Sequence, residues 1–115
     1  MTNQEPPIYR ATYELTVAIT RFLKFCPNDY KPTLGMLLQT EILKMEAVVF
    51  HVNDSENKRN SIQKALDSCY FVRMIIRLFL DLAIMKLETN IALNNYIDEC
   101  AKQLAGWKKS MTPVD

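Results

Sequence analysis

Apolar residues recur every three or four positions in four segments of the chain, the spacing of one face of an α-helix. The first segment starts at Pro7 and stops before Pro27, and the second starts near Pro32 and fades in the polar stretch NDSENKRN. Thr89 can serve as the N-cap of the fourth. The pattern predicts helices at about residues 7–26, 32–53, 58–86 and 89–110.

Four helices of this length with short connections favour one architecture. Neighbouring helices joined by short loops run antiparallel, which predicts a single domain over residues 1–115 folded as an up-down-up-down four-helix bundle. The composition agrees, because the chain has only two glycines, Gly35 and Gly106, and sheets depend on glycine-rich turns. We therefore expect an all-α protein.

The third predicted helix is apolar on two sides. It contains the run CYFVRMIIRLFLDLAIM, whose first stripe can face the core of the bundle. A helix that is apolar on two sides is either unusually central in its bundle or faces another subunit, and a large exposed apolar patch would itself promote association. This second stripe predicts an oligomer, and its residues are Phe71, Met74, Leu78, Leu82 and Met85.

Three charged residues interrupt the same run at intervals of four, Arg73, Arg77 and Asp81. Residues four apart are neighbours on a helix, so Arg77 can pair with Asp81 and leave Arg73 as a surface arginine. The alternative is that the two guanidinium groups contact a phosphate backbone or an acidic partner.

Other basic residues near the ends of the third and fourth helices form the remaining candidate contacts with a partner, with RNA or with DNA. The net charge of +1 produces no overall field that would attract nucleic acid, so any such binding must come from local patches repeated around an oligomer. These candidates are Lys58, Arg59, Lys64, Lys102, Lys108 and Lys109.

The sequence contains little that could perform catalysis. His51 is the only histidine, and no serine or cysteine lies in a nucleophile motif beside it. Cys26, Cys69 and Cys100 lack the spacing of metal ligands and predict buried free thiols. We expect no enzymatic activity, no metal and no cofactor.

The sequence also bears on location. The residues MTNQEPPIYR do not form a signal peptide, and charges within the longest apolar run argue against a membrane span. These features predict a cytoplasmic protein.

Three segments together resemble a known family. The segments PNDYKPTLGMLLQTEIL, FVRMIIRLFLDLAIM and YIDECAKQLAGWKKS, in this order and at these separations, are similar to the accessory variability determinant proteins of diversity-generating retroelements. The resemblance implies a four-helix bundle that assembles as a ring-shaped homopentamer, contacts the reverse transcriptase of the element and binds nucleic acid. It further implies that Arg73 and Arg77 contact the partner or nucleic acid, and that Gly106 allows close helix approach beside Trp107.

Two alternatives stay open. Proteins encoded by intervening sequences in 23S ribosomal RNA genes share the bundle architecture but typically carry an Asn-Ile-Ala-Glu-Gly-like stretch, whereas the second helix here reads EILKMEAVVFHVND. This difference favours the retroelement family. The other alternative is an enzyme or a cofactor-binding bundle, which the single histidine disfavours.

Overall fold

The computed structural model describes residues 6–111, which contain four α-helices and no strand. Two short helical turns, η1 (Lys31–Gly35) and η2 (Val52–Asp54), flank the second helix. The all-α prediction is confirmed for these residues, while residues 1–5 and 112–115 of the predicted domain lie outside them. The helices are α1 (Pro7–Lys24), α2 (Met36–Phe50), α3 (Lys58–Asp81) and α4 (Leu87–Ser110).

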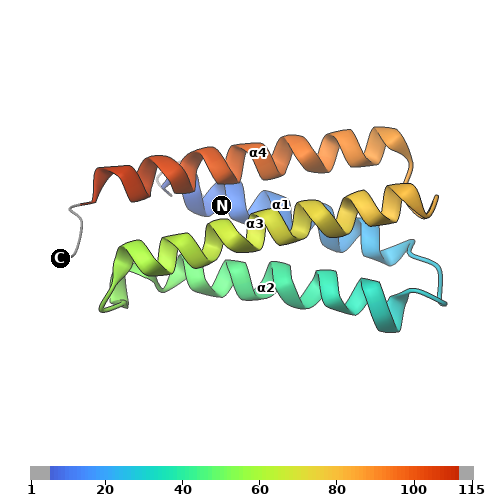
Figure 1. Ribbon diagram of the computed structural model, residues 1–115, viewed down its shortest axis with the longest axis horizontal. Helices are drawn as coiled ribbons and strands as arrows, with labels where there is room; N and C mark the ends of the chain where they lie inside the picture. The colour runs from blue at the N-terminus through green and yellow to red at the C-terminus, as the bar shows by residue number, and fades with distance from the viewer. Residues whose placement is uncertain (1–5, 112–115) are drawn as a thin grey trace.

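The four helices run in alternating directions and pack side by side (Figure 1). Helices α1 and α3 each pack against both α2 and α4, so the helices form a four-sided arrangement measuring 45 × 31 × 19 Å along its principal axes. This is the expected consequence of short connections, because each helix folds back on the one before it. The arrangement is consistent with the predicted four-helix bundle.

Each helix buries one apolar face in a common core. Phe22 of α1 meets Phe79 of α3 edge to face across the centre, with ring centroids 5.4 Å apart. Full burial of each large apolar side chain stabilises the fold by about 1.5–3 kcal/mol. The largest fully buried side chains include Leu15, Ile19, Ile42, Met45, Phe79, Ile97 and Leu104.

Helix α3 begins as expected and ends earlier than expected. Asn57 caps its start, because the side-chain oxygen accepts a hydrogen bond from Asn60 N at 3.0 Å. The helix ends at Asp81, so the predicted extent of 58–86 is wrong. Ala83 takes a left-handed conformation with φ 60°, and Ile84 N bonds back to Phe79 O at 2.9 Å. This is a Schellman ending, in which the residue at the left-handed position is usually glycine.

The other predicted boundaries also need correction. Helix α1 ends at Lys24, two residues before the predicted end. The second predicted helix is divided, because η1 forms a π-helical turn in which Gly35 N bonds Tyr30 O at 2.8 Å. A Cβ on Gly35 would lie 3.3 Å from that oxygen, so glycine suits this close approach. Thr89 is not the N-cap of α4, since the helix starts at Leu87 after Lys86.

Candidate interaction surfaces

Arg73 lies against the neighbouring helix. Its Nη1 donates to Asn94 Oδ1 at 2.9 Å and its Nη2 donates to Asp98 Oδ1 at 2.7 Å, both on α4. The side chain of Arg73 is 39% exposed and that of Asp98 is 63% exposed, so solvent reaches this ion pair. Arg73 therefore joins α3 to α4, and part of its guanidinium remains accessible.

Two asparagines extend this contact into the core. Asn94 Nδ2 donates to Asn90 Oδ1 at 3.0 Å, and the buried Asn90 donates from Nδ2 to the carbonyl oxygen of Ile76 at 3.0 Å. A buried amide without partners would be costly, so this chain satisfies the polar groups that α4 brings into the core. The polar network thus runs from the surface at Asp98 through Arg73, Asn94 and Asn90 to the backbone of α3.

Arg77 is oriented differently from Arg73. Its only ion pair in the described part of the chain is with Asp81, one turn further along α3, at 3.3 Å. Both side chains are well exposed, at 75% and 59%. The predicted local pair is therefore present, and an exposed pair of this kind contributes at most about 1 kcal/mol. Arg77 can exchange this partner for an external one at little cost.

Four of the predicted basic residues gather where α3 begins and α4 ends. Arg59 Nη1 donates to the carbonyl oxygen of Lys108 at 2.9 Å, and Lys108 Nζ donates to Gln63 Oε1. Lys58 and Lys109 lie next to them and are exposed. Arg59 thereby satisfies a terminal carbonyl group of α4, a structural role that the sequence did not reveal.

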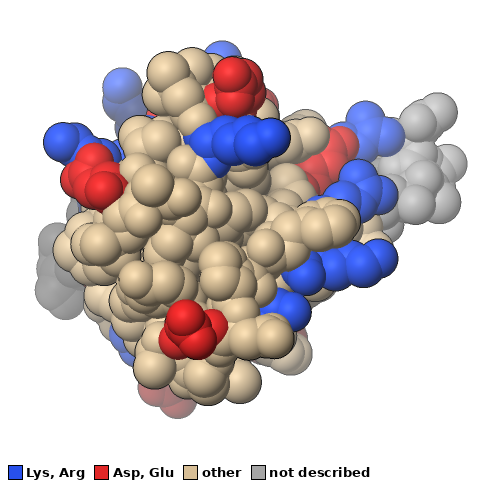
Figure 2. Space-filling view, turned by 90° about the vertical axis from the view of Figure 1, so that its right-hand side faces the viewer, with Lys and Arg blue, Asp and Glu red and all other residues tan. Residues whose placement is uncertain are grey.

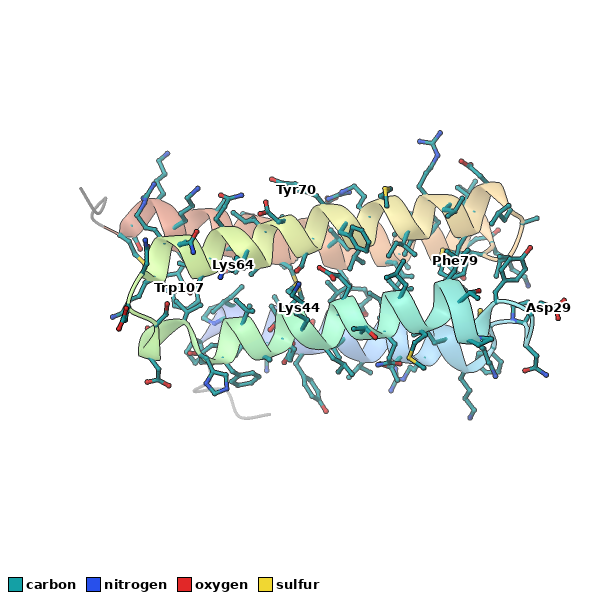
Figure 3. The ribbon with its side chains drawn as sticks, turned by 60° about the horizontal axis from the view of Figure 1, so that its bottom comes forward. Asp29, Lys44, Lys64, Tyr70, Phe79 and Trp107 are labelled. Carbon is teal, nitrogen blue, oxygen red and sulfur yellow. The ribbon has the colours of Figure 1, made fainter. Side chains whose placement is uncertain are left out.

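The structure does not bring the eight basic candidates together into one patch. Arg73 lies 14 residues beyond Arg59 on the same helix, which corresponds to about 21 Å along its axis. Lys64 faces the groove between α2 and α3, opposite Lys44 (Figure 3), and Lys102 lines a separate cleft between α1 and α4. These two lysines therefore line grooves that none of the other basic candidates lines.

The predicted interface stripe of α3 is only partly available to another subunit. Met74 is 57% exposed, Leu78 39% and Leu82 45%, although Leu82 lies just beyond the helix end. Phe71 is partly buried against the core. Met85 is only 3% exposed, so its assignment to the interface is wrong: the chain reverses at Ala83 and turns Met85 inward.

Tyr70 extends the exposed stripe in its place. It is 57% exposed and points away from the bundle (Figure 3), one turn before Met74. We call Tyr70, Met74 and Leu78 the α3 strip. The spacing of four between these residues was visible in the sequence, but Tyr70 could equally have been a core residue.

The end of the bundle formed by the connections after α1 and α3 carries few charges (Figure 2). Phe25 is the most exposed of its large apolar residues at 79%, and Leu82 lies at the same end. Lys and Arg side chains gather along the right-hand margin of this view, beside the end face and not on it (Figure 2). The end face itself therefore carries no concentrated positive charge.

Glu46 is the most unusual acidic group in the interior. Its Oε1 is buried without a hydrogen-bond partner, while Oε2 lies 3.1 Å from the hydroxyl of Thr16 on α1. Burial raises the pKa of Glu46, and the hydrogen bond from Thr16 partly opposes that change. The three cysteines are buried free thiols, and burial raises the pKa of Cys69 to about 11.

Within residues 6–111, no hydrogen bond or ion pair joins His51 to Glu46 or to the thiols. The exposed His51 places its Nδ1 3.9 Å from Oδ2 of Asp54, whereas the three thiols are buried. Among residues 6–111, no three His, Cys, Asp or Glu side chains gather as metal ligands could. None of the described helices is long and apolar enough to cross a lipid bilayer.

Gly106 does not have the predicted packing role within this chain. A Cβ at this position would meet no atom of the described residues within 4 Å, so none of the described helices approaches it closely. Trp107 is partly buried and packs against the core at the same end of the bundle. Trp107 thus contacts the core, whereas Gly106 lacks the close helix contact that was predicted for it.

No protein-family model matches this chain, and no curated protein matches it in sequence. The support for a function therefore comes from the geometry of these surfaces and from the resemblance of the three segments.

Proposed function

We propose that this chain is a non-enzymatic accessory protein of a diversity-generating retroelement. It works in the cytoplasm, assembles with copies of itself as a ring and binds the reverse transcriptase of the element. It supports mutagenic cDNA synthesis by holding the polymerase, and any RNA or DNA contacts arise from basic patches repeated around the ring. The resemblance of the three segments supplies the identity of the polymerase and the subunit number of five.

The observation that supports assembly most strongly is the exposed α3 strip. Tyr70, Met74 and Leu78 follow one another at intervals of one turn on the outer side of α3. Exposed apolar side chains in a continuous row favour association, because burying them removes apolar surface from water. The ion pair of Arg77 with Asp81 lies at the end of this strip and is exposed, so Arg77 is accessible to a different partner.

Light scattering on the purified protein tests the assembly. We expect a mass near five times the chain mass of 13.4 kDa. Replacing Met74 and Leu78 together by glutamate should reduce the mass to that of one chain, because the strip would then carry unpaired charge. Leu43→Glu is the matched control, since Leu43 is 49% exposed on α2. A monomeric unmodified protein, or an equal effect of the control, would contradict the assembly.

Copurification with the reverse transcriptase tests the partner. Arg77→Ala should weaken polymerase binding and leave the solution mass unchanged, because Arg77 makes only an exposed pair within its own helix. Arg73 contributes to polymerase binding through the accessible part of its guanidinium. Binding by the Arg73→Ala variant is expressed per amount of folded protein, because this substitution also removes the contact with α4. Arg21→Ala, at an exposed arginine on α1, is the control. Unchanged binding of the Arg77 variant would remove this residue from the contact.

A further inference from the structure

A cleft of about 460 Å³ opens between the start of α1 and the end of α4. It lies away from the α3 strip and is lined by two aromatic residues, a proline pair and three polar side chains. Clefts of this size that combine apolar walls with a few polar groups are typical of small-molecule sites. The residues that distinguish the cleft are Tyr9, Asn53, Lys102, Gln103, Gly106 and Trp107.

No contact within residues 6–111 requires a glycine at position 106. It lies within α4, where glycine destabilises a helix by about 1 kcal/mol relative to alanine. Its conformation is not left-handed, and a Cβ would meet open space. The missing side chain does have one consequence, because it leaves room in the cleft beside Trp107.

The aromatic walls are held in place by the fold. The ring of Tyr9 stacks on Phe50 with centroids 5.0 Å apart and an interplanar angle of 18°, which fixes its orientation. Trp107 packs partly against the core, so its indole cannot swing freely into solvent. Two rings held in this way offer flat apolar surface at a low cost in side-chain entropy.

The described lining of the cleft has one charged side chain. Among residues 6–111, Lys102 is the only charged residue that lines the cleft, and it belongs to no ion pair there. Asn53 and Gln103 add amide groups, and Gln103 Nε2 is already engaged with Glu99. A ligand that matches this lining has a flat aromatic part and an anionic group.

We propose that the cleft binds a small planar aromatic molecule that carries a carboxylate or another anionic group. The aromatic part lies against Tyr9 and Trp107, in the space that Gly106 leaves open. Lys102 pairs with the anionic group. This inference does not depend on the proposed polymerase partner, since it concerns another surface and a different class of ligand.

The test uses 2-naphthoate as the probe and the indole N–H signal of Trp107 in NMR spectra as the readout. Trp107 is the only tryptophan, so the signal is unambiguous. We expect 2-naphthoate to shift this signal in a saturable manner. Gly106→Leu should abolish the shift by filling the cleft, while the open space around position 106 allows the variant to fold.

A second variant tests the charge. Lys102→Gln should raise the dissociation constant of 2-naphthoate about tenfold and leave that of the neutral 2-naphthalenemethanol unchanged, because only the carboxylate loses a charged partner. Lys109→Gln, at an exposed lysine of α4 outside the cleft, should change neither constant. The proposal fails if the unmodified protein shows no saturable shift, if Gly106→Leu retains the affinity, or if Lys102→Gln weakens both molecules equally.

Discussion

Arg73 Nη2 and Asp98 Oδ1 lie 2.7 Å apart and join α3 to α4. Both residues lie within their helices and not at the helix ends. The next arginine on α3, Arg77, makes no contact of this kind with α4 and pairs with Asp81 of its own helix. Two arginines four residues apart therefore have different roles. One links two helices through a polar network, and the other remains available at the surface.

This difference predicts unequal effects on stability. Arg73→Ala removes the guanidinium group that donates to Asn94 and Asp98. This change should lower the free energy of unfolding by about 1–2 kcal/mol, because solvent exposure weakens these charge-assisted hydrogen bonds. Arg77→Ala should change it by no more than about 0.5 kcal/mol. Urea unfolding of both variants measures the difference. Equal losses would show that the link from Arg73 to α4 adds nothing to the fold.

The residues of this contact show which parts of the structure sequence patterns can predict. Arg77 and Asp81 are four residues apart, so helical periodicity alone predicted their pair. Asn94 and Asp98 lie 21 and 25 residues after Arg73, and their pairing depends on how α4 packs against α3. Local periodicity contains no information on such distant partners.

The same reasoning explains the boundaries. The four helices were predictable because the apolar repeat is a local property, whereas the end of α3 was missed because alanine occupies the position where a glycine would have marked the stop. The error at Met85 followed directly, since a continuing helix would have placed this residue on the outer stripe. The basic candidates were predictable as residue types, but their division among separate surfaces was not.

The left-handed alanine gives a second prediction. For a residue with a Cβ, the left-handed conformation of Ala83 costs roughly 1 kcal/mol or more of conformational energy relative to glycine. Ala83 is exposed, so its methyl group contributes little packing. Ala83→Gly should therefore stabilise the protein by about 1 kcal/mol and raise its melting temperature by about 4 °C. Calorimetry measures the change. Ala105→Gly, at an exposed position within α4, is the control and should destabilise the protein instead.

Glu46 predicts how stability depends on pH. Burial raises its pKa in the folded protein above the ordinary value, so between these two values the folded state holds a proton that the unfolded state has lost. The contribution of Glu46 to stability is therefore complete below its unfolded pKa of about 4.5 and declines as the pH rises through the folded pKa.

A hydrogen bond from Thr16 favours the ionised form of Glu46, but the Thr16 hydroxyl has a second, competing acceptor. This hydroxyl has one proton and two neighbours, Thr12 O at 2.8 Å and Glu46 Oε2 at 3.1 Å. When Thr16 donates to the Thr12 carbonyl, a protonated Glu46 can donate to Thr16 Oγ1, whereas an ionised Glu46 cannot.

Glu46→Gln should remove the decline in stability with rising pH in urea-unfolding experiments between pH 4.5 and 7.5. Glu14→Gln, at an exposed position on α1, is the control. An identical decline in the Glu46→Gln and Glu14→Gln variants would assign the effect to other groups.

The buried thiols give the last prediction. Only the thiolate reacts readily with disulfide reagents, and burial both blocks access and raises the pKa, to about 11 for Cys69. Cys26 and Cys100 are also buried with raised pKa values. Near neutral pH, a thiol-reactive disulfide should therefore modify none of the three cysteines in the folded protein and all three in urea.

The rate of modification should follow the opening of the fold, so it should rise in Arg73→Ala and fall in Ala83→Gly. A cysteine that reacts rapidly in the folded protein, at a rate that neither variant changes, would show that its part of the core opens independently of the contact between α3 and α4.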